Sequence, residues 1–357
     1  MSDAAARHLE PSLAPDHGDA LVEVRGLTKH FPLQAGFMAS LLNRGVIPAV
    51  RAVDGVDFDI RRGEVFGLAG ESGSGKSTVG RLVLNLLKPT AGTVAFDGRN
   101  LSRLSSEEMR RLRSKMQVIF QDPLASLNPR MTIGEAISHP SEIHEPDLTR
   151  SERRRRVFEM LDAVGMAPAD SYADKYPHQI SGGQRQRVAI ARALVTRPAL
   201  IVADEPIAMA DVSVRSLLLD LMMQLKDQFD LTYLFITHDL ATAKYVCDRI
   251  AVMYLGKIVE IGPLRDVYRS PLHPYTEALL RAVPVPDPRR RRTQPMPEGE
   301  IPNAADPPPG CSFHPRCPIA RHGLCEIETP VLQPDPAADQ PRHQAACHVR
   351  TGVVVRG

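Results

Sequence analysis

The chain has 357 residues, of which 43% are hydrophobic and 24% are charged, and its formal net charge is only +2. This composition is typical of a folded globular protein, and the near-balanced charge argues against a global attraction to nucleic acid. No apolar run approaches the length of a membrane span, and residues 1–20 lack the apolar core of a signal peptide. We therefore predict a disordered segment over 1–20 and a cytosolic chain that meets any membrane through a partner.

The first predicted elements are strands, between Leu21 and about Gly98. Apolar and polar residues alternate in Leu21–Val24 and Val53–Phe58, which is typical of half-buried antiparallel strands. Val65–Ala69 is instead continuously apolar, which predicts a strand buried on both faces.

A helical pattern covers most of the chain from Arg103 to Val195. Two further apolar runs, Leu200–Ala203 and Tyr233–Thr237, follow it and are separated by the helical pattern of Val214–Gln228. This alternation of strand, helix and strand predicts a parallel sheet, so the expected fold class is α/β.

A glycine-rich loop follows the buried strand that ends at Ala69. Its residues are Gly70, Glu71, Ser72, Gly73, Ser74, Gly75, Lys76, Ser77 and Thr78. They fit the P-loop pattern in the strand-then-helix context that this pattern requires. The glycines let backbone N–H groups face the phosphates, Lys76 supplies positive charge to the β- and γ-phosphates, and Ser77 is the expected Mg²⁺ ligand.

Polar residues follow three predicted strands at their carboxyl ends, where ligands bind in parallel sheets. Asp204 and Glu205 follow one strand, His238 follows the next, and Gln121 follows the run Gln117–Phe120. We predict that Asp204 holds Mg²⁺ through water, that Glu205 polarises the attacking water, and that Gln121 meets the metal or the water. Two alternatives stay open: a helix-capping role for the carboxylate pair, and a structural role for His238.

A second glycine-rich sequence, Ser181-Gly182-Gly183-Gln184, precedes a helical pattern. Glycine permits close approach, and a helix N-terminus attracts anions, so this junction is a second candidate phosphate-binding surface. An ordinary loop-to-helix junction is the alternative. One nucleotide needs only one phosphate-binding loop. The presence of two such sequences therefore indicates that each copy of the chain contributes half of an ATP site, and that ATP binds between two copies.

The order of these motifs resembles that of the ATP-binding cassette (ABC) ATPases over about Leu21 to Pro286. The resemblance implies a P-loop NTPase (RecA-like) core with an antiparallel β-subdomain and an inserted helical subdomain over about 126–191. The nucleotide-binding domain would span 21–285. Two such cassettes would close head to tail, with ATP between the P-loop of one and the signature of the other.

The resemblance also implies a role for individual residues. Glu205 is the expected catalytic base, His238 the transition-state stabiliser, and Gln121 the γ-phosphate sensor. The residues expected to act across the dimer are Ser181, Gly182, Gly183, Gln184 and Asp211. Phe31 lies where the family stacks an aromatic ring on adenine, although a core aromatic at a strand end is an equal alternative.

Longer stretches resemble one subfamily, the oligopeptide and dipeptide importer ATPases. These stretches are Phe120–Arg130, Tyr176–His178, His273–Leu280, Gly299–Asn303, Asp306–Pro308 and Gly310–Cys317. The resemblance implies that ATP hydrolysis drives uptake of peptides or a related small solute, at the cytoplasmic face of the cell membrane. The implied partners are two transmembrane permease subunits, which would bind in a groove around Leu124 to Tyr176. A second ABC ATPase, either the same chain or a paralogue, and indirectly an extracytoplasmic solute-binding protein complete the implied set.

Two positions depart from the family pattern. Ile180 stands where leucine is usual, and Ile207–Ala210 replaces the common Thr/Val-Ser-Ala-Leu before Asp211. The missing serine hydroxyl removes a polar contact across the dimer, which calls the coupling between the two ATP sites into question.

After Pro284 the chain is rich in proline, which predicts an extended linker carrying Arg289–Arg292 and then a cysteine-bearing region, together 286–357. The cysteines of this region are Cys311, Cys317, Cys325 and Cys347. In a reducing cytosol such a cluster is more often a metal site than a disulfide framework, but it lacks the paired spacing of most zinc ribbons. The subfamily resemblance implies a [4Fe–4S] cluster, with zinc and four reduced structural thiols as the alternatives.

One competing hypothesis is a soluble ABC-type ATPase that acts on nucleic acid or the ribosome. That class predicts a long coiled-coil insertion, zinc modules or two cassettes in one chain, and the sequence shows none of these. An exporter ATPase is a second hypothesis, and the subfamily-like C-terminal region argues against it. We therefore predict an importer ATPase that binds ATP and Mg²⁺ and does not bind nucleic acid.

Overall fold

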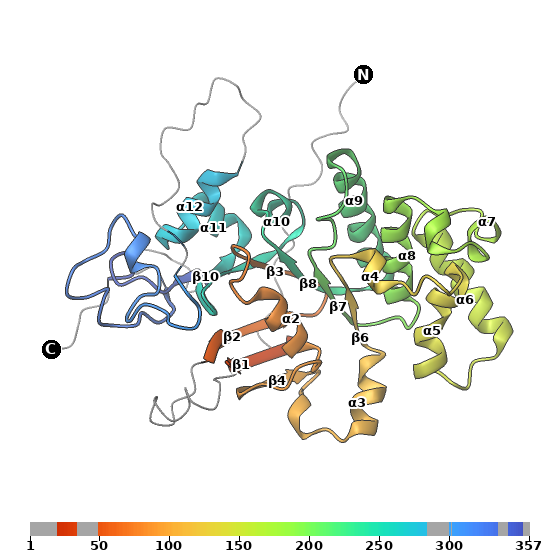
Figure 1. The fold of residues 1–357 in the computed structure, drawn as a ribbon, viewed down its shortest axis with the longest axis horizontal. Coiled ribbons are helices and arrows are strands. Elements are labelled where there is room, and N and C mark those ends of the chain that lie inside the picture. The colour runs from red at the N-terminus through yellow and green to blue at the C-terminus, as the bar shows by residue number, and fades with distance from the viewer. Residues whose placement is uncertain (1–19, 34–48, 284–299, 301, 335–341, 353–357) are drawn as a thin grey trace.

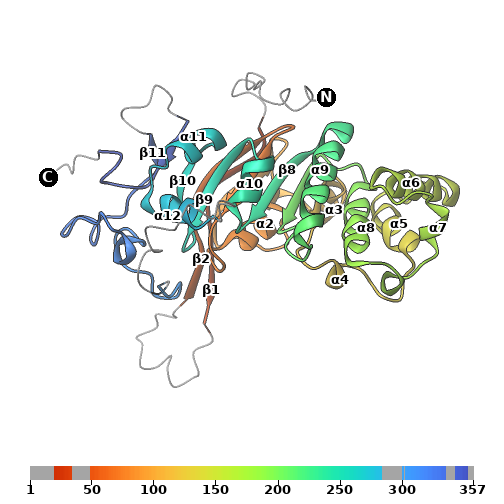
Figure 2. The ribbon, with the colours of Figure 1, turned by 90° about the horizontal axis from the view of Figure 1, so that it is seen from above.

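The computed structural model describes residues 20–33, 49–283, 300, 302–334 and 342–352. Nearly all of the segment predicted to be disordered, 1–20, and the arginine run Arg289–Arg292 lie outside these residues. Figures 1 and 2 show strands at the centre of the molecule, a group of helices at one end and the C-terminal segment at the other.

A four-stranded antiparallel sheet is built mainly from the first part of the chain, in the order β2-β1-β4-β5. Its strands are β1 (Ala20–Pro32), β2 (Ala49–Arg61), β4 (Ala91–Phe96) and β5 (Arg99–Asn100). Val24 pairs with Phe58 in the β1–β2 ladder, and both side chains are buried. The antiparallel strands predicted from alternation are therefore confirmed.

An eight-stranded sheet forms the centre of the molecule, in the order β11-β12-β10-β9-β3-β8-β7-β6. Its strands are β3 (Val65–Ala69), β6 (Met116–Ile119), β7 (Leu200–Asp204), β8 (Thr232–Thr237), β9 (Arg249–Tyr254), β10 (Lys257–Pro263), β11 (Gln333–Pro334) and β12 (Gln344–Ala345). The pairs from β9 through β3, β8 and β7 to β6 are parallel. Every residue of β3 and β8 is buried, as their continuous apolar runs predict.

The helices follow the pattern of the sequence. They are α2 (Lys76–Val83), α3 (Ser106–Arg113), α4 (Pro123–Ser126), α5 (Ile133–His144), α6 (Arg150–Ala163), α7 (Asp170–Ala173), α8 (Gly182–Leu194), α9 (Val212–Phe229), α10 (Leu240–Val246), α11 (Leu264–Arg269) and α12 (Pro274–Ala282), with short 3₁₀ turns at Leu101–Arg103, Pro177–Gln179 and His314–Arg316. Three helices at one end, α5, α6 and α8, begin with capping boxes at Thr132, Thr149 and Ser181. Each box satisfies backbone N–H groups that the first helical turn leaves without a partner.

Alternate side chains of the central strands enter two hydrophobic clusters on opposite faces of the sheet. Tyr233 and Phe235 of β8 join the cluster that holds α8, α9 and α10. Leu234 and Ile236 join the cluster that holds α2 and the antiparallel sheet. Because side chains alternate along a strand, one buried strand supports both layers.

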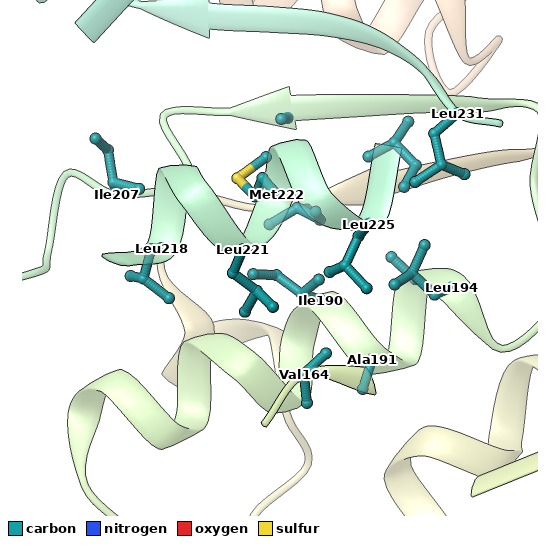
Figure 3. Packing of buried hydrophobic residues seen from close by; sticks show 14 of the residues in the cluster. Val164, Ile190, Ala191, Leu194, Ile207, Leu218, Leu221, Met222, Leu225 and Leu231 are labelled. Atoms are coloured by element: carbon teal, nitrogen blue, oxygen red, sulfur yellow. The ribbon is translucent and has the colours of Figure 1, made fainter. Parts of the chain in front are cut away.

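Helix α9 links the central sheet to the helical end of the molecule. Figure 3 shows Leu221 and Leu225 of α9 facing Ile190 and Leu194 of α8, and all four side chains are at least 92% buried. This packing fixes the position of α8, and therefore of the Ser181 junction at its start, relative to the sheet.

The C-terminal region extends the central sheet. β12 pairs with β10 through Glu260 and Ile261, opposite Ala345 and Gln344, and β11 pairs with β12. This extension was not predicted, because two-residue strands have no readable periodicity.

Candidate nucleotide-binding site

The P-loop lies between β3 and α2, in a conformation that requires glycine. Gly70, Gly73 and Gly75 have φ of 151°, 80° and 106°. A Cβ at Gly70 would lie 2.3 Å from the Met253 carbonyl oxygen, and one at Gly75 would lie 2.1 Å from the Ala52 carbonyl oxygen. The loop is therefore pressed against β2 and β9, and only glycine fits these two positions.

Lys76 directs its charge into this loop. Its Nζ donates to the carbonyl oxygens of Gly70 and Glu71, each over 2.8 Å. Burial lowers the pKa of Lys76, and the negative charges of Glu205, Asp204 and Glu71 oppose that change. The ammonium group therefore lies inside the loop whose backbone N–H groups would bind the phosphates of a nucleotide. Of the remaining predicted residues, Ser74 is buried, Ser72 is exposed and Thr78 is half-buried.

Ser77 and Asp204 meet at the carboxyl edge of the sheet. The Ser77 hydroxyl donates to Asp204 Oδ1 over 3.0 Å. Burial raises the pKa of Asp204, the Ser77 hydrogen bond lowers it, and the neighbouring Glu205 charge raises it further. Hydroxyl and carboxylate oxygens are the ligands that Mg²⁺ prefers, so this pair fits the predicted metal.

Glu205 joins two other predicted residues. Its Oε2 accepts a hydrogen bond from Gln121 Nε2 over 3.0 Å, and its Oε1 lies 3.0 Å from His238 Nδ1. The backbone of Glu205 is left-handed, with φ of 49°, a strained conformation that recurs at functional sites. α9 begins only at Val212. The helix-capping alternative for the carboxylate pair is therefore excluded.

The Ser181–Gln184 sequence forms the start of α8. The Gln184 N–H donates to Ser181 Oγ over 3.3 Å, and the Ser181 N–H donates to Gln184 Oε1 over 2.9 Å. The junction opens onto a cavity of about 580 Å³ that Asp122, Met209 and Asp211 also line, and no residue of the P-loop lines it. Both views place α8 apart from α2 (Figures 1 and 2).

Phe31 lies near the end of β1 and is 37% exposed, with Lys29 Nζ 5.1 Å from the ring centre. The ring is therefore on the surface and not in the core.

Known proteins share both the core and the C-terminal region of this chain. The family described as "ABC transporter" matches residues 53–208, and the family described as "Oligopeptide/dipeptide transporter, C-terminal region" matches residues 259–325. The "Probable peptide ABC transporter ATP-binding protein y4tS" of Sinorhizobium fredii is 46% identical over 93% of this chain and 90% of its own length. The "Oligopeptide transport ATP-binding protein AppF" of Bacillus subtilis is 45% identical over 93% of this chain and 98% of its own length.

The chain belongs to the ABC transporter ATP-binding family.

Solved cassettes confirm the predicted fold of this ABC ATPase. The dimeric post-hydrolysis structure of the ATP-binding cassette MJ0796, bound to ADP and Pi, is 30% identical, with a TM-score of 0.59 over 68% of this chain and 99% of that one. The cbiO1 structure from Clostridium perfringens is 28% identical, with a TM-score of 0.59 over 71% of this chain and 92% of that one. In the described part of the chain, no helix has both the length and the apolar character to cross a bilayer.

The predicted [4Fe–4S] cluster is wrong. The matched family and relatives are ABC ATPases with no indication of iron–sulfur chemistry. Among the residues that the structure describes, no group of three or more His, Cys, Asp or Glu side chains is placed to hold a metal ion. Burial, together with the neighbouring thiols, raises the pKa of Cys311 and Cys317 to about 11 in the metal-free chain.

The four cysteines are buried or partly buried among apolar and aromatic side chains. Cys311 and Cys317 pack against the aromatic cluster around Phe313, and Cys325 and Cys347 are buried. None of the four forms a disulfide in the structure.

Two contacts to the P-loop were not predicted. The Glu71 N–H donates to the Tyr275 hydroxyl, and Arg316 forms an ion pair with the Glu71 carboxylate. These partners lie 204 and 245 residues further along the chain, so no local motif identifies them.

Proposed function

We propose that this chain is the ATP-hydrolysing subunit of an importer for oligopeptides, dipeptides or a related small solute. The observation that carries the ATPase role is the Glu205 carboxylate, held by Gln121 and His238 at the sheet edge beside the P-loop. The match to an oligopeptide/dipeptide transporter C-terminal region and the names of the relatives support the substrate class.

In this proposal Glu205 is the general base for in-line attack of water on the γ-phosphate. A hydrogen bond from Gln121 and the close contact with His238 fix its carboxylate, so that little reorganisation is needed as it accepts the proton of the water. Lys76 balances phosphate charge, and His238 stabilises the charge that develops at the γ-phosphate. Mg²⁺, held by Ser77 and through water by Asp204, would neutralise charge on the β- and γ-phosphate oxygens.

The same proposal completes each ATP site with a second ABC ATPase, either the same chain or a paralogue. The residues that would act across this pair are Ser181, Gly182, Gly183, Gln184 and Asp211. The separate cavity at the start of α8 supports this arrangement, because none of its lining residues belongs to the P-loop. Phe31, exposed near the end of β1, would stack on adenine.

The remaining partners are two transmembrane permease subunits, with the chain bound peripherally at the cytoplasmic face and a solute-binding protein acting on the other side. The helical subdomain, about 126–191 within a nucleotide-binding domain of 21–285, would supply the groove. Exposed apolar side chains within it support this role, because Ile143 and Tyr176 are 45% and 39% exposed. The segment 286–357 would be the linker and cysteine-bearing region.

Co-expression with the two permease subunits of a candidate peptide importer tests the proposal. We expect a membrane complex whose Mg²⁺-dependent ATPase activity rises with the transported peptide and disappears in Lys76→Ala. Nucleic-acid or ribosome binding without a permease would instead favour the soluble ABC-type ATPase.

A further inference from the structure

We propose that Tyr275 and Arg316 are positioning residues that hold the P-loop, at Glu71, in its phosphate-binding shape. The Glu71 N–H lies 2.9 Å from the Tyr275 hydroxyl, and Arg316 Nη1 lies 3.4 Å from Glu71 Oε2. Both partners belong to the stretch 259–325 that matches the oligopeptide/dipeptide transporter C-terminal region, outside the matched ABC core. The inference rests on the ATP-binding role proposed for the P-loop.

These contacts are shielded from solvent. Tyr275 is 1% exposed and the Arg316 side chain is 7% exposed, while the Glu71 side chain is 20% exposed. Charge-assisted contacts in such a setting are screened little by water or salt, in contrast to ion pairs at an open surface. We call the contacts of Tyr275 and Arg316 with Glu71 the tether. The tether connects the C-terminal region to the P-loop.

Aromatic packing makes the tether rigid. The ring centres of Tyr275 and Phe313 lie 4.6 Å and 5.3 Å, respectively, from that of Tyr254. Arg316 lies over the Phe313 ring at 5.8 Å, and its Nη1 also donates to the Tyr254 hydroxyl over 3.5 Å. Such packing restricts the rotamers of both side chains that reach Glu71.

A buried carboxylate fixes the start of the helix that carries Tyr275. Glu260 is fully buried and accepts the backbone N–H groups of Leu272 and His273, each over 2.8 Å. Glu260 also lies 2.7 Å from Nε2 of His343, beside β12. The two residues that lead into α12 are thereby tied to β10 and to the C-terminal region.

The tether acts on a part of the P-loop that has unusual conformational freedom. Glu71 lies between Gly70 and Gly73, and glycine loses more conformational freedom on ordering than any other residue. Lys76 Nζ donates to the Glu71 carbonyl, so the position of Glu71 also sets that of the phosphate-binding lysine. A loop that is already ordered binds phosphate with a smaller entropic cost. The tether should therefore raise ATP affinity without altering the step that Glu205 performs.

The test measures Mg²⁺-ATP binding and steady-state hydrolysis by the full chain, in the complex with its permeases. Tyr275→Phe removes only the hydroxyl, and Arg316→Gln removes the charge. Each is expected to weaken ATP binding by about three- to tenfold, the effect of one lost hydrogen bond, and to raise KM with kcat unchanged. Arg316→Lys keeps the charge and is expected to recover most of the affinity.

Two control variants remove the same groups elsewhere. Tyr245→Phe removes a hydroxyl that bonds Asp220, and Arg350→Gln removes a guanidinium that lies 3.5 Å from Glu277 in the C-terminal half. Both should bind ATP as the wild type does. A general loss of fold would lower the melting temperature and kcat together, which would overturn the positioning role.

A double-mutant cycle between Glu71→Gln and Arg316→Gln decides whether the two residues act together. Coupled residues give a double variant that binds ATP about as well as the Arg316 variant alone, because the second change removes no further contact. If wild type binds ATP but the tether variants bind it equally well, or if the two effects simply multiply, the inference is wrong and the proposed function stands. If wild type binds no ATP, the proposed function itself fails.

Discussion

Glu205 is the residue at which the ends of three strands converge, through Gln121 after β6 and His238 after β8. Replacing its carboxylate by an amide keeps the shape of the side chain but removes the proton acceptor. We expect Glu205→Gln to bind Mg²⁺-ATP normally and to lower turnover by about 10²- to 10⁴-fold, the range for a general base. Single-turnover hydrolysis and equilibrium ATP binding check this, and normal hydrolysis by the variant would remove Glu205 from the base role.

Asp204 illustrates a conflict between stability and metal binding. Because burial raises its pKa, the folded state holds the Asp204 proton more tightly than the unfolded state, and the ionised carboxylate costs stability at neutral pH. Asp204→Asn should therefore raise the melting temperature of the nucleotide-free protein and weaken Mg²⁺-dependent ATP binding by about 10- to 100-fold.

The sign of this effect can be checked by pH. The gap in melting temperature between Asp204→Asn and wild type should shrink as the pH falls and Asp204 takes up its proton in the wild type. The matched control is Asp227→Asn, whose side chain is 82% exposed and whose stability should follow the wild type. A gap that is independent of pH would show that burial of the charge is not its cause.

The residues of the ATP site differ in how far the sequence predicts them. Ser77, Asp204, Glu205 and His238 follow apolar runs that can be identified as parallel strands, so their meeting at one edge was predictable. The contacts of Glu71 were not, because they depend on how α12 and the C-terminal region fold back over the P-loop.

At the scale of elements, Glu260 is a buried connection between β10, α12 and the C-terminal region. Glu260→Ala would leave the backbone N–H groups of Leu272 and His273 buried without their acceptor. Each such group costs about 1–3 kcal/mol, so we expect the free energy of unfolding to fall by roughly 2–6 kcal/mol. Denaturant unfolding measures this loss.

A second Glu–His pair in the same region supplies the control. His322 Nδ1 lies 2.8 Å from Glu326 Oε1 at the surface, where the His322 side chain is 93% exposed. Glu326→Ala should cost less than about 1 kcal/mol, as is usual for exposed ion pairs. Equal losses from the buried and the exposed variant would mean that the Glu260 contacts do not hold the C-terminal region in place.

The strands and helices themselves were predictable where the hydrophobic pattern is long. β3 and β8 are continuous apolar runs, and α9 has a clear helical period. β11 and β12 have two residues each, and their place in the sheet depends on pairing with β10 and not on their own sequence. The prediction of a [4Fe–4S] cluster was wrong for a related reason. The spacing of cysteines in the sequence does not show whether their thiols pack in the interior or converge on a metal.

At the scale of the whole molecule, the P-loop and the Ser181 junction lie on different parts of the fold, as the separate lining of the α8 cavity indicates. Ser181 therefore allows a test of whether this second candidate phosphate-binding surface acts on ATP bound to a neighbouring ATPase. Aspartate is as good a helix N-cap as serine, so Ser181→Asp should keep the fold and the melting temperature. Its negative charge, however, would repel the γ-phosphate at the start of α8.

In the hydrolysis-deficient Glu205→Gln background, we expect ATP to drive stable pairing of the ATPase subunits in the permease complex, detected by cross-linking. Ser181→Asp added to this background should abolish pairing, whereas the isolated chain should still bind ATP with unchanged affinity. Ser181→Asn, a neutral N-cap, separates the effect of charge from that of the lost hydroxyl. If Ser181→Asp weakens ATP binding by the isolated chain as strongly as it weakens pairing, the junction acts on its own P-loop, and a site shared between two subunits is excluded.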